Sequence, residues 1–317
     1  MNRELSPEAT ELGSVVRDRL ENAGGFEFLR AVVADPTRRA EAGDILDEVG
    51  LWDLGPLLDP IELEAAAAAS SAAGSFCFPY PVVERLAAGG GARAIALISR
   101  AAPRVTSHLD LPFEWRGLDL TGVGYRVAPA GELLRTPAAP FGVPSTAVPE
   151  GALGVRDAAV AIALHAWWLL GLLRRAADDT IRYTSERVQF GRTLDKFQAV
   201  AFRLADMELA IRSVDEMARY ALWSIARGDD ERSGLVDALA LRVAALEAAD
   251  TVLRGAHQLH GAMGFTDEVP VSWMWRMSQS VRRLPEDRTR TLGVLGDLVG
   301  RAGLGELGRP ERVAEPA

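Results

Sequence analysis

Two short blocks in the C-terminal third of the sequence combine cationic, amide and glycine residues where helices are expected to end. The first block contains Arg187, Gln189, Phe190 and Gln198, and the second contains Gln258, Gly261 and Ala262. Guanidinium and amide groups donate hydrogen bonds to phosphate oxygens, and glycine lets the backbone approach a ligand closely. Helix ends add backbone groups that can bind an anion. The two blocks therefore predict a site for a phosphate-bearing cofactor.

Each block also has a purely structural interpretation. Arg187 could cap the carbonyl groups of its own helix, or pair with Glu186 or Asp195. Gly261 could be the glycine that ends a helix before a turn, which is a common arrangement. For a lone arginine or a lone glycine the structural interpretation would be favoured. It is the combination of residues within each block that favours a ligand site.

The composition of the chain limits its possible functions. Its 317 residues are enough for two or three packed layers, and 48% apolar and 25% charged residues are ordinary for a globular protein. A net charge of -9 argues against a general nucleic-acid or anionic-membrane surface, but not against an anionic ligand held by local arginines. Because Cys77 is the only cysteine, no intrachain disulfide or thiolate cluster can form, and we assign no metal site.

The distribution of apolar residues, prolines and glycines predicts a mainly α fold in three parts. We expect an N-terminal helical domain at 1–90 and a reduced β-domain with a connector at 91–150. A C-terminal four-helix bundle follows at 151–302, because long apolar helices joined by short loops pack in this way. The polar tail at 303–317 is expected to be disordered.

Within these parts the patterns predict individual elements. The long helices of the bundle are expected at 155–187, 197–227, 235–260 and after Pro270. An alanine-rich helix at 62–73 is expected to end at Gly74. Four prolines are expected to make the end of the β-domain an irregular connector; they are Pro137, Pro140, Pro144 and Pro149.

The longest apolar run covers residues 158–173 and carries His165 near its middle. It is shorter than the ~20 apolar residues of a membrane-spanning helix, so we expect a buried core helix. The polar and acidic N-terminus has no secretory signal. These features predict a cytoplasmic protein.

The two blocks together resemble the flavin-binding half of the acyl-CoA dehydrogenase family. The first match runs over 183–198 and continues to Met207, and the second also includes Gly264, Phe265, Glu268 and Pro270. Ala262 stands where the family usually has a second glycine. The resemblance implies FAD as cofactor, with Arg187 on the pyrophosphate and its neighbours along the adenosine. It also implies an obligate oligomer, because in this family the bundle of the neighbouring subunit holds the adenine end of each FAD.

Desaturation of an acyl thioester needs a carboxylate that removes the α proton while the β hydride passes to the flavin. Carried over by spacing from Gly264, one family position for this glutamate falls on Pro285, next to Glu286. The other falls near Ala161, in a stretch with no acidic residue between 158 and 177. Glu286 is thus the candidate catalytic residue. Its alternative role is structural: in the first turn of the last helix, its negative charge would interact favourably with the helix dipole.

The middle region is shorter than the β-domain that holds the flavin ring in full-length family members, and Thr106 and Ser107 are the candidates for a flavin contact. With its short middle domain and its segment 79–82, the chain resembles one subunit of the actinobacterial heteromeric (α2β2) acyl-CoA dehydrogenases. Those enzymes act on CoA thioesters of steroid side chains. The resemblance implies a heterotetramer in which a homologous full-length subunit holds the flavin ring, the acyl-CoA and the base, and passes electrons to a separate acceptor. Two alternatives remain open: a self-sufficient homo-oligomer that uses Glu286, and a non-catalytic structural subunit.

Overall fold

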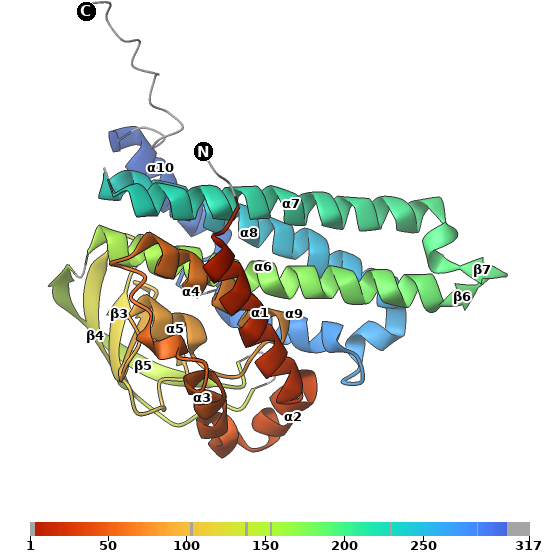
Figure 1. The fold of residues 1–317 in the computed structure, drawn as a ribbon, viewed down its shortest axis with the longest axis horizontal. Coiled ribbons are helices and arrows are strands. Elements are labelled where there is room, and N and C mark those ends of the chain that lie inside the picture. The colour runs from red at the N-terminus through yellow and green to blue at the C-terminus, as the bar shows by residue number, and fades with distance from the viewer. Residues whose placement is uncertain are drawn as a thin grey trace, which may run out of the picture.

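The computed structural model describes residues 4–101, 104–136, 139–152, 154–228, 230–283 and 285–302. Within these residues the predicted mainly α architecture is confirmed, with N-terminal helices, a small sheet and a long helical bundle (Figure 1). The predicted disordered tail at 303–317 lies outside the described residues.

The N-terminal part consists of short helices and one buried, alanine-rich helix. They are α1 (Pro7–Asn22), α2 (Phe26–Ala34), α3 (Arg39–Asp47), α4 (Pro60–Ser75) and α5 (Val82–Ala87), with the 3₁₀ turns η1 (Pro36–Arg38) and η2 (Leu51–Asp53). The Ser6 hydroxyl caps α1 by accepting a hydrogen bond from the Ala9 N–H at 3.3 Å. Asp59 caps α4 in the same way, accepting from the Ile61 N–H at 2.7 Å. Because α4 consists largely of alanine, serine and glycine, its neighbours α1 and α6 can pack closely against it.

Two glycines set the distance between α4 and α6 (Val155–Glu186). A Cβ atom on Gly74 would lie 1.8 Å from the carbonyl oxygen of Trp168, and one on Gly171 would lie 1.9 Å from that of Ser71. Both distances are far inside van der Waals contact, so only glycine permits this approach. The expectation that Gly74 ends its helix is wrong, because α4 continues to Ser75 and Gly74 is the point where it meets α6.

The middle part is a five-stranded sheet with the strand order β1-β3-β4-β5-β2. The strands are β1 (Arg93–Leu97), β2 (Arg104–Ser107), β3 (Glu114–Leu118), β4 (Val123–Pro129) and β5 (Gly142–Ala152). β1 and β3 are parallel, and the other neighbours are antiparallel. The predicted irregular connector is wrong for residues 142–149, because they belong to β5. Pro137 lies outside the described residues.

The positions of two prolines in the ladder explain why β5 forms. Pro149 pairs with Tyr125 beside a register shift of the β4–β5 ladder, and proline is tolerated at such a bulge. Pro144 lies near the start of the strand, opposite Val105, and its carbonyl accepts a hydrogen bond from the Ala130 N–H at 2.8 Å. Each proline therefore lies where its missing N–H is tolerated.

The bundle runs from α6 to the last helix. Its further helices are α7 (Gln198–Arg227), α8 (Glu231–His260), α9 (Pro270–Arg283) and α10 (Arg288–Ala302). A hairpin of β6 (Val188–Gln189) and β7 (Arg192–Thr193), followed by η3 (Leu194–Lys196), joins α6 to α7, and η4 (Gly261–Phe265) follows α8. In Figure 1 this hairpin lies at the end of the bundle that is far from the five-stranded sheet.

Helix α6 is long and apolar enough to cross a membrane, but 83% of its apolar stretch is buried inside the protein. The prediction of a core helix over the apolar run is thus confirmed. Cys77 is also fully buried, and burial raises the pKa of its thiol, so it is an inert core residue.

Gly74→Ala should destabilise the fold by about 1–3 kcal/mol, because the added methyl group forces α4 and α6 apart. Urea denaturation of the full chain measures the change. Gly293→Ala is the matched control, since a Cβ atom at this position in α10 would meet nothing within 4 Å. The control should leave stability unchanged or raise it by up to about 1 kcal/mol through helix propensity. Equal effects of the two substitutions would contradict the close helix contact.

Candidate functional site

The first predicted block lies at the C-terminal end of α6, outside the core. Arg187 caps this helix, and its backbone N–H donates to the Tyr183 carbonyl at 2.9 Å. The following hairpin turns at Phe190 and Gly191, whose φ angles of 52° and 79° suit the tight turn with two positive φ values. The turn leaves the Phe190 side chain in solvent, 90% exposed.

The polar side chains of this block are exposed as well, namely Arg187, Gln189 and Gln198. Among the described residues the Arg187 guanidinium has no hydrogen bond or ion pair, so neither structural alternative is formed. Asp195, one of its possible partners, pairs instead with Lys196 at 3.0 Å. Arg187 is therefore a solvated cation that is available to a ligand.

The second block lies beside the first. The ring of Tyr183 stacks on the ring of His260 at the end of α8, with centroids 4.4 Å apart and planes at 19°. Gly261 follows with a positive φ of 57° and ends the helix. Gln258, Gly261 and Ala262 are all exposed. The structure thus brings the two blocks together at one end of the bundle (Figure 1).

Large apolar side chains are exposed near these blocks. Phe265 in η4 is 78% exposed, Phe202 in the second turn of α7 is 61% exposed, and Val188 in the hairpin is also exposed. Soluble monomers rarely leave groups of such side chains in water. This end of the bundle therefore combines polar ligand-binding groups with apolar surface that a second chain or a cofactor can cover.

Glu286, the candidate catalytic residue, joins the last helix to the sheet. Its carboxylate accepts hydrogen bonds from the Ser99 hydroxyl at 3.0 Å and the Arg100 N–H at 3.3 Å, and pairs with Arg290 at 3.1 Å. Its carbonyl accepts a hydrogen bond from Arg242 at 2.9 Å. Burial lowers the pKa of Arg242 to about 10, against the opposing charge of Glu286. These contacts support a structural role for Glu286, and its catalytic role stays a prediction.

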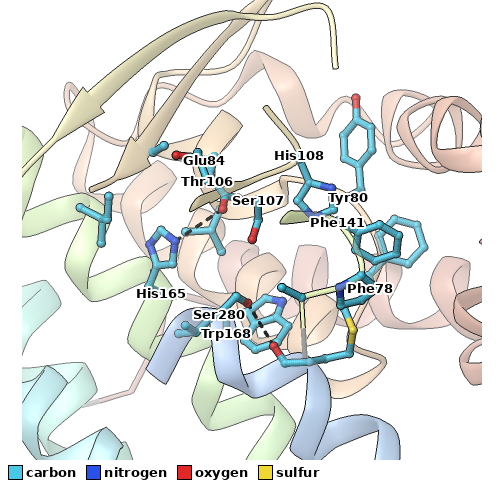
Figure 2. Close-up of a pocket in the computed structure, with 17 residues that line it drawn as sticks. Phe78, Tyr80, Glu84, Thr106, Ser107, His108, Phe141, His165, Trp168 and Ser280 are labelled. Carbon is cyan, nitrogen blue, oxygen red and sulfur yellow. Dashed lines mark hydrogen bonds and ion pairs between the residues drawn. The ribbon is translucent and has the colours of Figure 1, made fainter. Parts of the chain in front are cut away.

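A cavity of about 80 Å³ lies where the sheet meets α5, α6 and α9 (Figure 2). Phe78, Phe141 and Trp168 form much of its wall. Glu84 from α5 and His165 from α6 give it a polar side, and Figure 2 marks the ion pair between them. Glu286 lies outside this lining. The cavity is thus a second candidate site, at the opposite end of the bundle from Arg187.

The carboxylate of Glu84 and the imidazole of His165 face each other in this cavity. Nε2 of His165 lies 3.7 Å from Oε1 of Glu84, and its Nδ1 lies 2.7 Å from the carbonyl oxygen of Ala161. A carbonyl oxygen only accepts, so Nδ1 carries the proton of this hydrogen bond. Burial opposes ionisation of Glu84, but the hydrogen bond and charge of His165 hold the pKa of its carboxyl below the ordinary value. Glu84 is therefore a carboxylate.

His108 lies on the same cavity and is neutral. Its ring stacks on Phe141 with centroids 5.0 Å apart, and its backbone N–H donates to the Phe141 carbonyl at 2.8 Å. Burial lowers the pKa of His108 to about 4, although the charge of Glu84 acts in the opposite direction. Its Nδ1 has no hydrogen-bond partner in the described part of the chain. Thr106 and Ser107, the candidates for a flavin contact, line the cavity too.

The sequence does not predict this cluster, because Glu84, His108 and His165 come from three distant segments that share no motif. The one available signal was His165 inside an apolar run, since a titratable residue in a buried helix needs a polar partner. Across the described ranges, no group of three histidine, cysteine or acidic residues is arranged to hold a metal ion.

Comparison with known proteins identifies the bundle. The acyl-CoA dehydrogenase C-terminal domain matches residues 160–284. The match runs from α6 to α9 and covers 125 of the 317 residues. The mitochondrial short-chain specific acyl-CoA dehydrogenase of Bos taurus is 32% identical over 174 residues, which are 55% of this chain and 36% of that protein. The match thus covers about a third of the length of this relative.

Solved structures resemble nearly the whole chain. A variant of the Tcur3481-Tcur3483 steroid ACAD has a TM-score of 0.77 at 21% identity, covering 94% of this chain and 99% of that one. The ChsE4-ChsE5 complex from Mycobacterium tuberculosis gives a TM-score of 0.76 at 17% identity, covering 95% of this chain and 99% of that one. At these identities the likeness shows the fold, and it extends beyond the acyl-CoA dehydrogenase bundle to the N-terminal helices and the sheet.

Acidification should weaken this acyl-CoA dehydrogenase fold through His108. Its pKa is about 4 in the folded protein against an ordinary 6.5, so between these values the unfolded chain binds the extra proton. The contribution of neutral His108 to the free energy of unfolding is complete above pH 6.5 and should fall by about 2 kcal/mol between pH 7 and pH 5. Urea denaturation at both pH values measures the loss. His108→Phe, which keeps a ring on Phe141, should show a pH dependence smaller by this amount. An unchanged pH dependence would be evidence against a neutral buried His108.

Proposed function

We propose that this chain is the shortened subunit of an FAD-dependent acyl-CoA dehydrogenase, and that it supplies the adenosine-pyrophosphate half of the FAD site to a partner subunit. The main support is the exposed Arg187 guanidinium, which has no counter-ion among the described residues and lies beside the second block. A cation of this kind, surrounded by exposed amides and glycine backbone, suits a diphosphate.

Each predicted cofactor residue has a role in this proposal. Arg187 pairs with the pyrophosphate, and the backbone at Gly261 and Ala262 approaches the phosphate oxygens. The remaining side chains line the adenosine; they are Gln189, Phe190, Gln198 and Gln258. Since Gln198 begins α7, the positive end of that helix dipole also lies at this site.

The flavin ring, by contrast, does not fit this chain's own cavity at the sheet. That cavity measures about 80 Å³. Benzene alone occupies a cavity of roughly 150 Å³, and the isoalloxazine has three fused rings. His165 and Arg187 are also 22 residues apart on α6, or about 33 Å along the helix, which exceeds the length of one extended FAD. An FAD held at Arg187 therefore places its ring in another chain.

The partner in this proposal is a homologous, full-length acyl-CoA dehydrogenase subunit, and the assembly is a heterotetramer. The exposed apolar side chains Phe190, Phe202 and Phe265 supply a surface for it. Two structures with the same fold carry names that join two different chains, which supports a heteromer. The steroid ACAD among them supports a CoA thioester with a steroid side chain as the substrate.

The proposed reaction is α,β-desaturation of that thioester in the cytoplasm. Bound FAD would supply the acceptor for the β hydride and its electron pair, and a separate electron-transfer acceptor would take up the electrons. The α proton passes to a carboxylate of the partner, and the electrons of the α C–H bond form the new double bond. Residues of this chain bind and orient the cofactor and cover it from water.

Arg187→Ala should lower the FAD affinity of the assembled complex by about 10- to 100-fold, because one or two charge-assisted hydrogen bonds to phosphate are lost. FAD titration of the apo-complex, prepared by co-expression with a full-length homologue, measures the effect. The chain expressed alone should bind FAD far more weakly than the complex.

Arg212→Ala is the control for this experiment. It removes another exposed arginine, from the middle of α7, where it pairs with Glu208 at 2.6 Å, and FAD affinity should not change. Stoichiometric FAD and full turnover in the chain alone would defeat the division of labour. A colourless complex would favour the alternative of a non-catalytic structural subunit.

Glu286→Gln separates the proposal from its rival, a self-sufficient homo-oligomer that uses Glu286 as the base. The observation behind the rival is that the Glu286 carboxylate is largely buried near the sheet, only 13% exposed. With the base in the partner, turnover of the complex should change by less than about tenfold. Loss of several orders of magnitude in kcat, with FAD still bound, would establish the rival.

A further inference from the structure

One ring contact joins the two blocks of the proposed FAD site, which come from helices far apart in the sequence. Arg187 follows the last turn of α6, and Gly261 follows the last turn of α8. The rings of Tyr183 and His260 stack between these helix ends, with centroids 4.4 Å apart and planes at 19°. The separation of the two blocks therefore depends on this stack.

The side chain of His260 is held by three contacts. It is 5% exposed, and its Nδ1 donates to the Ala256 carbonyl oxygen at 2.9 Å, because a carbonyl only accepts. The η4 turn folds back onto it, so that a Cβ atom on Gly264 would lie 3.2 Å from the Cβ atom of His260. The ring of Tyr183 is the third contact. The position of the His260 ring is thus fixed, and with it the start of the second block at Gly261.

Tyr183 connects this fixed ring to the first block. Its carbonyl accepts a hydrogen bond from the Arg187 N–H at 2.9 Å, and the Arg187 carbonyl accepts one from the Leu194 N–H at 2.9 Å. Residues four apart on a helix lie on the same face, so Arg187 leaves α6 on the side of the stacked ring. The guanidinium of Arg187 has no hydrogen bond or ion pair among the described residues. Its place before a ligand binds is therefore set by the backbone that Tyr183 anchors.

A ligand site made from two helix ends needs a contact of this kind. Helix ends fray, because their last turns lack part of their hydrogen-bond partners, and the polar side chains of both blocks are exposed. A diphosphate that bridges Arg187 and the Gly261 backbone loses affinity if its binding must first order them. The stack supplies that order in advance, and its buried His260 ring leaves the exposed groups free for the ligand.

We propose that Tyr183 and His260 are positioning residues of the cofactor site, whose stacked rings hold Arg187 at the separation from the Gly261 backbone that one diphosphate spans, without touching the diphosphate. This inference rests on the proposed FAD site and adds the pair of residues that orders it before FAD binds. The loss of the stack therefore acts on FAD through Arg187.

FAD titration of the apo-complex, co-expressed with a full-length homologue, compares two substitutions of one residue. Tyr183→Leu keeps an apolar side chain and removes the ring, so the FAD affinity should fall about tenfold. Tyr183→Phe keeps the ring and should bind FAD as the wild type does. His260→Leu and His260→Phe repeat the comparison from the other side of the stack, and they cover the case in which Tyr183→Leu does not assemble.

Combination with Arg187→Ala separates positioning from a general loss of stability. Without the guanidinium the stack has no cation to position, so Tyr183→Leu should weaken FAD binding by about twofold or less in this background. Phe28→Leu is the matched control. It removes another buried stack, that of Phe28 on Phe78 with planes also at 19°, and should leave the FAD affinity of the folded complex unchanged.

The positioning role is overturned if a folded complex with Tyr183→Leu binds FAD normally, or if Tyr183→Phe loses as much affinity as Tyr183→Leu. It is also overturned if Tyr183→Leu has the same effect with and without Arg187, or if Phe28→Leu weakens FAD equally. Normal binding by Tyr183→Leu beside a weakened Arg187→Ala removes only the positioning role. An Arg187→Ala complex with unchanged FAD affinity instead removes the proposed FAD site, and the positioning role with it.

Discussion

The packing of α6 is the constraint on which the rest of the structure depends. Its apolar stretch is buried on all sides, against α4, α7, α8 and α9. Gly74 and Gly171 bring its backbone against α4 with no side chain between them. A helix that is apolar all round and closely packed can neither turn nor slide without losing contacts on every side. It therefore holds His165 at the cavity and Arg187 at the other end of the bundle in fixed positions.

The sequence predicts those features of the fold that depend on neighbouring residues. The helix expected at 197–227 is found at Gln198–Arg227, because apolar periodicity and helix ends are local properties. β5 was missed because the effect of a proline depends on its place in the ladder, and the bulge opposite Tyr125 cannot be read from β5 itself. Gly74 was misjudged for a similar reason, since the backbone of Trp168 that makes it necessary lies almost a hundred residues away.

The two candidate sites also differ in how far they depend on residues that are neighbours in the sequence. Each block around Arg187 and Gln258 is continuous in sequence and lies at a helix end, so its residue types could be predicted to bind phosphate. Their adjacency, through the stacking of Tyr183 on His260, needed the fold. The cluster of Glu84, His108 and His165 has no local signature at all. Three segments meet there only because α5, β2 and α6 surround one space.

In the proposed division of labour the proton-abstracting step belongs to the partner, and the contacts of the carboxylates at the sheet agree with this proposal. A general base must approach the substrate with a free carboxylate whose pKa is not far below the working pH. Glu84 lies 3.7 Å from the ring of His165, and the hydrogen bond and charge of His165 lower the pKa of the Glu84 carboxyl against the effect of burial. Glu286 is held by Ser99, Arg100 and Arg290, and using it as a base would break the link between α10 and the sheet. Ala161, where a second base position falls, offers only a carbonyl, which already binds His165.

The bundle end around Arg187 differs from the sheet, because its polar groups are exposed and the Arg187 guanidinium has no partner among the described residues. The contacts of Glu84 and Glu286 and the exposure of Arg187 thus both agree with the proposal that this chain binds the cofactor and leaves proton abstraction to its partner.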